Sequence, residues 1–227
     1  MTASVLENLE KIEQTILETC QKEKRNREDI QIIAVTKYVS INRAKEAIGA
    51  GVTQLGENRD EGLLQKYDII GNEATWHFIG TLQTRKVKNI IDKVDYIHSL
   101  DRLSLAKEID KRAKHRIKCF IQVNVAEEES KHGLSVEEVL PFVEAVKDFS
   151  NIEIVGLMTM APHTDNEQVL RNCFRTLKQL QVHVQELSLS YAPCTELSMG
   201  MSNDYAIAIE EGATFIRLGT TLVGSEC

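Results

Sequence analysis

A lysine at the end of an apolar run is the first residue in this sequence that could do chemistry. The stretch IIAVTKYVS, residues 32–40, begins with five uncharged residues, and Lys37 stands where this run meets a polar turn. An unprotonated lysine amine is a nucleophile that forms Schiff bases, and partial desolvation or a nearby cation increases the unprotonated fraction. A lysine that is merely solvated at a strand end is the plain alternative, so other residues must decide between the two interpretations.

Two later segments combine hydroxyl groups and glycine in a way that suits an anion. SMGMS, residues 198–202, precedes the helical pattern NDYAIAIEEG, and RLGTT, residues 217–221, contains Gly219 and Thr220. Glycine allows backbone N–H groups to converge on a phosphate without a side chain in the way. Each segment alone is also typical of an ordinary turn, whereas the two together at neighbouring strand ends favour a phosphate site.

An arginine lies just before the second of these segments. On a strand, Arg217 shares a face with Phe215, while Ile216 and Leu218 lie on the other face. The guanidinium therefore points into the mouth of a barrel or forms a salt bridge with a glutamate on a neighbouring strand. With Lys37 and a phosphate site in the same mouth, the arginine would complete a binding site for an aldehyde that carries a phosphate.

Composition limits the class of protein. The 227 residues are 42% hydrophobic and 27% charged, which is typical of one soluble α/β domain over residues 1–227. Lys and Arg number 27 against 34 for Asp and Glu, which gives a net charge of −7. The composition therefore shows no excess of positive charge of the kind that binds nucleic acid. We expect neither a secretory signal nor a membrane span. The five cysteines form no C-x-x-C pair, which argues against disulfides or a metal site and indicates the cytoplasm: Cys20, Cys119, Cys173, Cys194 and Cys227.

Strand and helix patterns alternate along the chain. Eight apolar or β-branched runs predict strands at 31–36, 52–56, 76–80, 94–98, 117–125, 152–159, 194–198 and 214–218. Helical patterns lie between them at 42–50, 58–70, 101–115, 135–149 and 166–187, and Ser135 with Glu138 predicts a capping box. Residues 5–24 predict a leading amphipathic helix whose apolar face holds Val5, Leu6, Leu9, Ile12, Ile16 and Leu17.

This alternation predicts an α/β fold, a (β/α)8 TIM barrel with an extra N-terminal helix. An open doubly wound sheet is the alternative. In a barrel the residues after each strand gather at one end, and a phosphate commonly binds between the loops after strands seven and eight. The segments at 198–202 and 217–221 occupy those two positions.

A set of motifs resembles the pyridoxal phosphate homeostasis protein family. The resemblance extends from about residue 30 to residue 224, and its most specific motifs are GEN at 56–58, WHFIGTLQTRK at 76–86, LSMGMSND at 197–204 and RLGT at 217–220. It implies a barrel like the N-terminal domain of alanine racemase, with pyridoxal 5′-phosphate (PLP) held on Lys37 as an internal aldimine. It also implies that Arg217 faces the pyridine nitrogen, and that other cofactor-binding residues are Asn58, His77, Ser198, Met199, Ser202, Gly219 and Thr220.

The arginine bears on reactivity. A guanidinium donates a hydrogen bond but does not protonate the pyridine nitrogen, which weakens the ring as an electron sink. The resemblance implies that racemases of this fold add a second domain and a tyrosine base, whereas this sequence ends at residue 227, nine residues after 218. Tyr38 is expected to point away from Lys37, and Tyr205 lies on the following helix, so neither is an obvious second base.

Two classes of function are therefore considered. The first is a PLP-binding protein in intracellular vitamin B6 homeostasis and amino-acid and keto-acid balance, without turnover. It would be a monomer and would exchange cofactor with PLP-dependent apoenzymes. The second is a small PLP-dependent amino-acid racemase or lyase with Lys37 as its catalytic residue. A Schiff-base aldolase on a sugar phosphate fits the lysine and the phosphate site but not the resemblance. The missing second base favours the first class.

Overall fold

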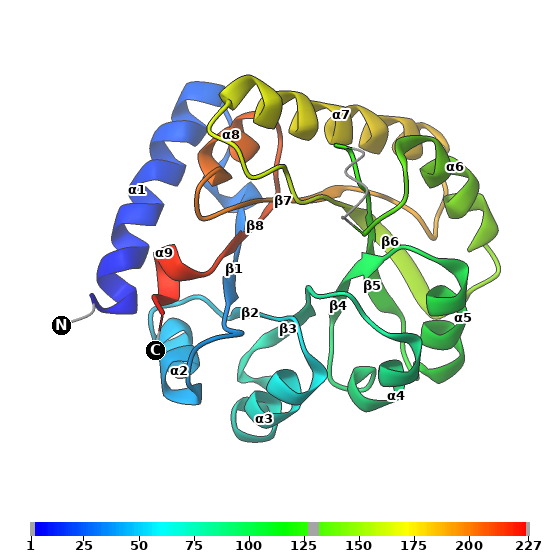
Figure 1. Ribbon diagram of the computed structural model, residues 1–227, viewed down its shortest axis with the longest axis horizontal. Coiled ribbons are helices and arrows are strands. Elements are labelled where there is room, and N and C mark those ends of the chain that lie inside the picture. Colours follow the sequence, from blue (N-terminus) through cyan, green and yellow to red (C-terminus); the bar gives the residue numbers. More distant parts are fainter. Residues whose placement is uncertain (1–2, 127–131, 226–227) are drawn as a thin grey trace.

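Eight parallel strands form a closed barrel in the computed structural model, which describes residues 3–126 and 132–225. Each strand pairs with the next along the chain, and β8 pairs with β1, which closes the ring (Figure 1). The strands are β1 (Gln31–Val35), β2 (Gln54–Glu57), β3 (Thr75–Phe78), β4 (Tyr96–Leu100), β5 (Ile117–Gln122), β6 (Ile152–Met158), β7 (Glu196–Met201) and β8 (Phe215–Leu218). The predicted TIM barrel is confirmed, and the open doubly wound sheet is wrong.

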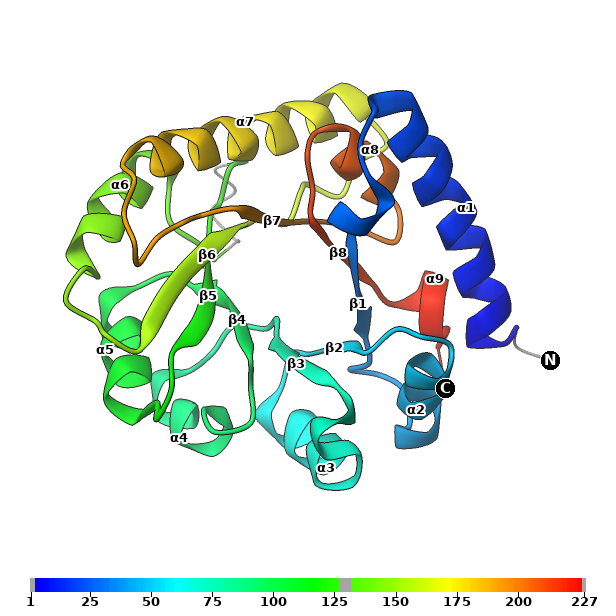
Figure 2. The same cartoon turned by 180° about the vertical axis from the view of Figure 1, so that it is seen from behind.

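Helices surround the barrel, as Figures 1 and 2 show from opposite sides. They are α1 (Val5–Glu23), α2 (Ile41–Gly49), α3 (Asp60–Ile70), α4 (Val87–Ile90), α5 (Leu103–Arg112), α6 (Val136–Ala145), α7 (Glu167–Glu186), α8 (Tyr205–Glu210) and α9 (Thr220–Val223). Short 3₁₀ turns lie at Arg27–Asp29, Gly71–Glu73 and Thr84–Lys86. The predicted helices are confirmed, as is the capping box of Ser135 and Glu138 at the start of α6.

The leading helix α1 packs against α2, α8 and α9 on the outside of the barrel (Figure 1). Ser4 and Glu7 form a capping box at its start. The amphipathic helix is present as predicted, but Leu6 and Leu17 of its apolar face are 53% and 54% exposed. The helix contacts the domain along one narrow stripe, and these two leucines lie beside it; the buried apolar residues of the stripe are Val5, Leu9, Ile12, Ile16 and Cys20.

Apolar side chains form two layers. The larger layer fills the space between the strands and the helices and includes Ile216 and Leu218 of β8. The smaller layer lies inside the barrel and consists of Ile33, Phe120, Val155, Met158 and Phe215. Side chains alternate between the two faces of a strand, so Arg217 points inward with Phe215, as predicted.

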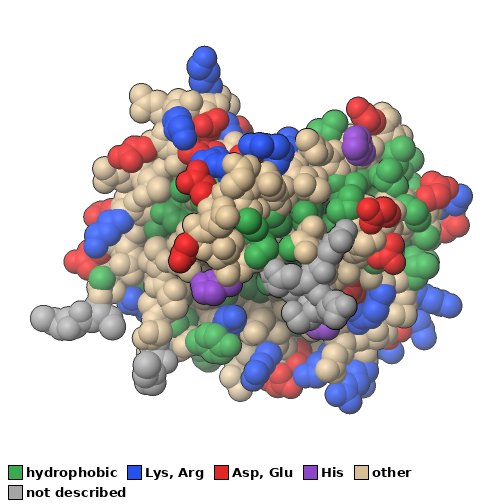
Figure 3. Space-filling view, turned by 45° about the horizontal axis from the view of Figure 1, so that its top comes forward, with side chains coloured by type: hydrophobic (Ala, Val, Ile, Leu, Met, Phe, Trp, Pro, Cys, Tyr) green, Lys and Arg blue, Asp and Glu red, His purple; other side chains and the backbone are tan. Residues whose placement is uncertain are grey.

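The surface carries charges of both signs. Figure 3 shows Lys and Arg side chains interspersed with Asp and Glu side chains over one face of the molecule. Among the described residues no helix is long and apolar enough to cross a membrane. Residues 127–131, which follow β5 in the sequence, lie outside the described residues.

Candidate functional site

A cavity of about 890 Å³ opens at the carboxyl ends of the barrel strands. We call it the strand-end cavity. Loops after β1, β2, β3, β6, β7 and β8 line it, which is where a TIM barrel places its functional residues. Six of the residues predicted from the sequence line this cavity together: Lys37, Asn58, Ser202, Arg217, Gly219 and Thr220.

Lys37 lies in the turn that follows β1. Its side chain is exposed, so the expectation of partial desolvation is wrong. The Nζ atom lies 4.8 Å from the centre of the Tyr38 ring, and Tyr38 lines the same cavity. The expectation that Tyr38 points away is also wrong, because β1 ends at Val35 and the alternation of a strand does not extend to residues 37 and 38.

The backbone before Lys37 is held by a buried ion pair. Glu57 at the end of β2 accepts a hydrogen bond of 2.6 Å from the Thr36 hydroxyl, and its Oε1 lies 2.9 Å from Nζ of Lys66 on α3. The Thr36 N–H also donates to the carbonyl of Gly56 at 3.0 Å. Because Thr36, Glu57 and Lys66 are all buried, these contacts fix the point from which the Lys37 side chain departs.

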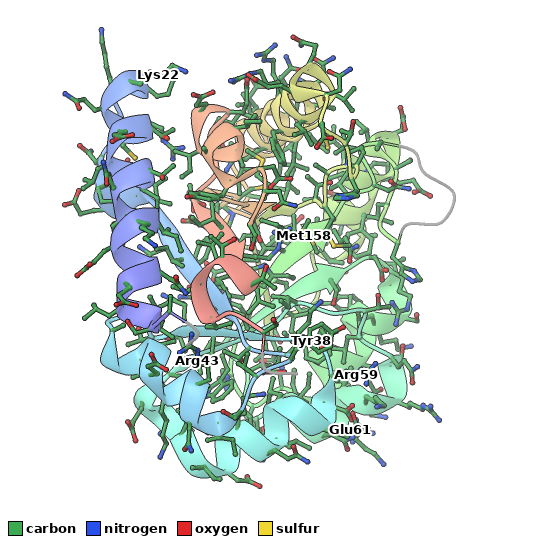
Figure 4. All side chains as sticks on the ribbon, turned by 60° about the vertical axis from the view of Figure 1, so that its left-hand side comes forward. Lys22, Tyr38, Arg43, Arg59, Glu61 and Met158 are labelled. Carbon is green, nitrogen blue, oxygen red and sulfur yellow. The ribbon has the colours of Figure 1, made fainter. Side chains whose placement is uncertain are left out.

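Glycine allows the loops after β2 and β3 to approach closely. A Cβ atom at Gly80 would overlap the backbone of Asn58, so no other residue fits there without a shift. Asn58 is half-buried and lines the cavity beside Gly80. The turn that carries Tyr38 and the loop that carries Arg59 follow the paired strands β1 and β2 and lie close together in Figure 4.

The loops after β7 and β8 line the cavity and contain unpaired backbone N–H groups. Within the described part of the chain, no acceptor takes the N–H groups of Ser202, Asn203 or Gly219. Asp204 accepts from the N–H of Met201 at 2.6 Å, which holds the first of these loops in its turn. Unpaired N–H groups that line a concave surface, with the hydroxyls of Ser202 and Thr220 nearby, are suited to an anion such as a phosphate.

Arg217 is a buried cation at the inner end of the cavity. It is 4% exposed and donates from Nη1 to Ser198 Oγ at 2.7 Å and from Nη2 to the carbonyl of Thr159 at 2.8 Å. Burial lowers the pKa of Arg217 to about 10, and the Asp204 carboxylate partly offsets this effect. The side chain therefore stays charged at neutral pH. Among the described residues no glutamate forms a salt bridge with it, so that alternative from the sequence is wrong.

Three other predicted residues do not line the cavity. The side chains of His77, Ser198 and Met199 are 0% exposed. Met199 packs in the layer between strands and helices, whereas His77 and Ser198 lie inside the barrel. A contact of these three side chains with a ligand in the cavity has no support in this geometry, because other side chains already surround them.

His77 and Ser198 belong to a continuous hydrogen-bonded chain through the barrel, which we call the barrel chain. Ser198 Oγ lies 2.9 Å from Nδ1 of His98, Nε2 of His98 lies 2.9 Å from Nδ1 of His77, and Nε2 of His77 lies 2.6 Å from Oε1 of Gln54. With the bond from Arg217 to Ser198, the chain connects the cavity to the first residue of β2.

Both histidines of the barrel chain are neutral. Burial, assisted by the charge of Lys118, lowers the pKa of His77 to about 3, and burial also lowers the pKa of His98 well below its usual value. Sequence analysis missed His98. The available signal was its place two residues after Tyr96, on the inward face of β4, where a barrel normally holds branched apolar residues.

Comparison with known proteins agrees with this fold and site. The family described as alanine racemase, N-terminal domain, matches residues 7–227. A pyridoxal phosphate homeostasis protein of Aquifex aeolicus is 40% identical over 223 residues, which cover 96% of this chain and 96% of that protein. The solved structure of PipY from Synechococcus elongatus PCC7942 with PLP bound has a TM-score of 0.82 at 28% identity and covers 97% of this chain and 100% of that chain.

An alanine racemase of Corynebacterium glutamicum shares the fold at lower similarity. Its TM-score is 0.71 at 14% identity, and the match covers 96% of this chain but 59% of the racemase. The chain thus belongs to the alanine racemase N-terminal-domain family. Within it, the chain belongs to the pyridoxal phosphate homeostasis proteins, which confirms the resemblance seen in the sequence motifs.

Proposed function

We propose that this chain binds pyridoxal 5′-phosphate in the strand-end cavity and acts in intracellular vitamin B6 homeostasis, without turnover of its own. The observation that supports it best is the meeting of an amine, a buried cation and unpaired N–H groups in one cavity. Lys37 supplies the amine, Arg217 the cation, and the loops after β7 and β8 the N–H groups. The PLP-bound PipY structure and the relatives named pyridoxal phosphate homeostasis protein support the choice of ligand.

The donor set fits this ligand. When bound, PLP supplies an aldehyde that forms a Schiff base with an amine and a ring that withdraws electrons. Lys37 is exposed to the cavity and free of any carboxylate partner among the described residues, so its amine is accessible to an aldehyde. Ser202, Gly219 and Thr220 would hold the phosphate through N–H and hydroxyl groups.

Arg217 supports a binding role over a catalytic one. Its pKa of about 10 keeps it protonated at neutral pH. It would therefore donate a hydrogen bond to the pyridine nitrogen and would not supply that nitrogen with a proton. A ring that stays unprotonated stabilises a carbanion less well, which fits a protein that stores or transfers PLP and so affects amino-acid and keto-acid balance.

A second candidate, a PLP-dependent amino-acid racemase or lyase, gains one observation from the structure. Tyr38 lines the cavity and its ring lies 4.8 Å from Lys37 Nζ, so a second ionisable side chain is present near the amine. Tyr38 and Lys37 are consecutive residues of one turn, however, and a racemase needs its two bases on opposite faces of the ring. We therefore prefer the first function, with PLP-dependent apoenzymes as partners and a monomer as the active form.

Two measurements on the purified protein test the proposal. Titration with PLP is expected to saturate at one ligand per chain, and the loaded protein is expected to activate an apo-transaminase. Incubation of the loaded protein with a panel of L-amino acids is expected to give no racemised or decarboxylated product. Sustained turnover of any amino acid would support the second candidate, and failure to bind PLP would contradict both.

A further inference from the structure

The barrel chain joins residues that are far apart in the sequence. His98 on β4 and Ser198 on β7 are separated by 100 positions, yet their polar atoms lie 2.9 Å apart inside the barrel. The ring of Phe120 stacks on His98 with 4.3 Å between centres, and the ring of Tyr96 stacks on His77 at 4.5 Å. Each imidazole thus has an aromatic ring stacked on one face, and its hydrogen bonds lie in the ring plane at the two nitrogens.

The two ends of the chain fix the direction of every hydrogen bond. A guanidinium only donates, and an amide oxygen only accepts. Arg217 must donate to Ser198, and among the described residues the Ser198 hydroxyl has no acceptor for its own proton other than His98 Nδ1, so it donates to that nitrogen. His98 then carries its proton on Nε2 and donates to His77, which carries its proton on Nε2 and donates to Gln54 Oε1.

No other placement of the histidine protons gives every buried donor and acceptor of the barrel chain a partner. If His98 carried its proton on Nδ1 while remaining neutral, His77 would have to donate from Nδ1, and its bare Nε2 would face the oxygen of Gln54 at 2.6 Å. If either histidine gained a second proton, Nδ1 of His98 would donate to Ser198. The Ser198 hydroxyl would then accept two hydrogen bonds and lose the acceptor for its own proton, which is costly in a fully buried site.

We propose that His98, acting through Ser198, is a positioning residue that holds the Arg217 guanidinium at the inner end of the strand-end cavity. The neutral chain leaves Arg217 as the only charged member and fixes its Nη1, while the carbonyl of Thr159 fixes its Nη2. These two hydrogen bonds hold both terminal nitrogens and so fix the orientation of the planar guanidinium. The effect on PLP binding rests on the function proposed above. The positioning of Arg217 by the barrel chain does not depend on that function.

The surroundings of the histidines favour the neutral state. The charged groups that act on them are Lys118 of β5 for His77 and Arg217 of β8 for His98, and both are cations. Tyr96 of β4 stacks on His77, and its hydroxyl accepts a hydrogen bond of 3.2 Å from Lys118. Within residues 3–126 and 132–225 no carboxylate contributes to the electrostatic environment of either ring, so no described acidic group would stabilise an imidazolium.

The first test uses the wild-type protein without added ligand. Nitrogen-15 NMR of histidine-labelled protein distinguishes the two tautomers and the imidazolium. We expect two histidines, assigned by their loss in His77 and His98 variants, to remain in the Nε2–H form from about pH 5 to about pH 9. An Nδ1–H tautomer or a protonated ring in this range, for either residue, would overturn the proposal.

The second test separates positioning from mere packing. His98→Phe keeps a ring beside Phe120 but removes the acceptor for Ser198, whereas His98→Asn keeps an acceptor near the position of Nδ1. In wild type and in His98→Asn we expect slowly exchanging Arg217 guanidinium protons in the NMR spectrum. In His98→Phe these signals should broaden or disappear, while near-ultraviolet circular dichroism reports whether the fold is retained. Unchanged signals in folded His98→Phe would overturn the proposal.

A third measurement adds PLP. His98→Phe is expected to bind PLP about tenfold more weakly than wild type, which corresponds to one lost hydrogen bond, and to change the pH dependence of its absorption spectrum. His98→Asn is expected to restore most of both properties. If wild type fails to bind PLP while the NMR results hold, the proposed function fails and the positioning of Arg217 stands. If PLP binds but the tautomers differ from those expected, the positioning of Arg217 by His98 fails and the proposed function stands.

Discussion

The guanidinium of Arg217 on β8 donates a hydrogen bond of 2.7 Å to the hydroxyl of Ser198 on β7. This bond keeps Ser198 inside the barrel, although the next serine of the same motif, Ser202, lines the strand-end cavity. Two serines only four positions apart thus have different surroundings. Ser198 supports the arginine from within, and Ser202 is available to a ligand.

Replacing Arg217 tests its proposed contact with the ring of PLP. Arg217→Glu should let the pyridine nitrogen retain a proton, because a carboxylate stabilises the charged ring. The absorption spectrum of the bound PLP and its pH dependence should therefore change, whereas Arg217→Gln, a neutral donor, should change them less. An unchanged spectrum in an Arg217→Glu protein that is fully loaded with PLP would show that Arg217 does not touch the ring.

The phosphate site is tested by comparing two ligands. Wild type should bind PLP far more tightly than pyridoxal, because each hydrogen bond to a charged group contributes about 1.5 to 3 kcal/mol. The double variant Ser202→Ala with Thr220→Val should reduce this difference by about 3 kcal/mol or more, which is over about a hundredfold in affinity ratio.

Paired titrations of PLP and pyridoxal measure the effect. Thr81→Val, which changes a cavity residue outside the two phosphate loops, serves as the control and should leave the ratio as in wild type. The double variant should also release PLP faster to an apo-transaminase. Equal affinity of wild type for the two ligands would contradict the phosphate site, and an unchanged ratio in the double variant would assign it to other residues.

The buried pair of Glu57 and Lys66 should contribute strongly to stability. Removing one partner leaves a charge buried without its counterion, so Glu57→Gln and Lys66→Met should each lower the free energy of unfolding by about 3 to 5 kcal/mol. The double variant should recover much of this loss. Urea denaturation measures these values, with Lys114→Ala in an exposed ion pair as a control that should leave the midpoint unchanged. A double variant as unstable as the sum of the single variants would show that the two side chains do not act as a pair.

Acid should destabilise the fold through the barrel histidines. The pKa of His77 is about 3 in the folded protein, whereas an unfolded chain has a histidine pKa of about 6.5. Between these values the unfolded state binds more protons, so stability rises with pH and falls as the pH decreases below about 6.5, by about 1.4 kcal/mol per pH unit for each such histidine.

Urea unfolding at several pH values tests this dependence. In His77→Gln, the replacement can still accept from His98 and donate to Gln54, but it does not titrate. The slope of stability against pH between about pH 6 and about pH 4 should therefore be smaller than in wild type by the contribution of one histidine. The same slope in both proteins would show that His77 is not buried in the neutral form.

The sequence predicted the barrel correctly because each strand is a short apolar run with a polar end. The same signal brought six site residues to one cavity, since residues after parallel strands must meet at one end of a barrel. It could not place Tyr38, because β1 ends before Lys37 and the turn brings both side chains to the cavity. Nor could it separate Leu6 and Leu17 from the buried stripe of α1, which depends on how closely the helix packs.

Sequence patterns could not predict the barrel chain. The contact of His98 with Ser198 depends on strand register and on the closure of the barrel across 100 residues, and no local pattern carries that information. His77 was chosen from a resemblance in a motif, and the motif alone does not distinguish a side chain that faces a ligand from one that faces the barrel interior.

The most direct test of the account is the site of covalent attachment of PLP. Borohydride reduces a Schiff base to a stable amine, so the PLP-loaded protein is reduced, digested and mapped by mass spectrometry. We expect one adduct, on Lys37, and none in a Lys37→Met protein treated in the same way. An adduct on another lysine in the wild-type protein, or a saturated protein with no adduct at all, would contradict the central role assigned to Lys37.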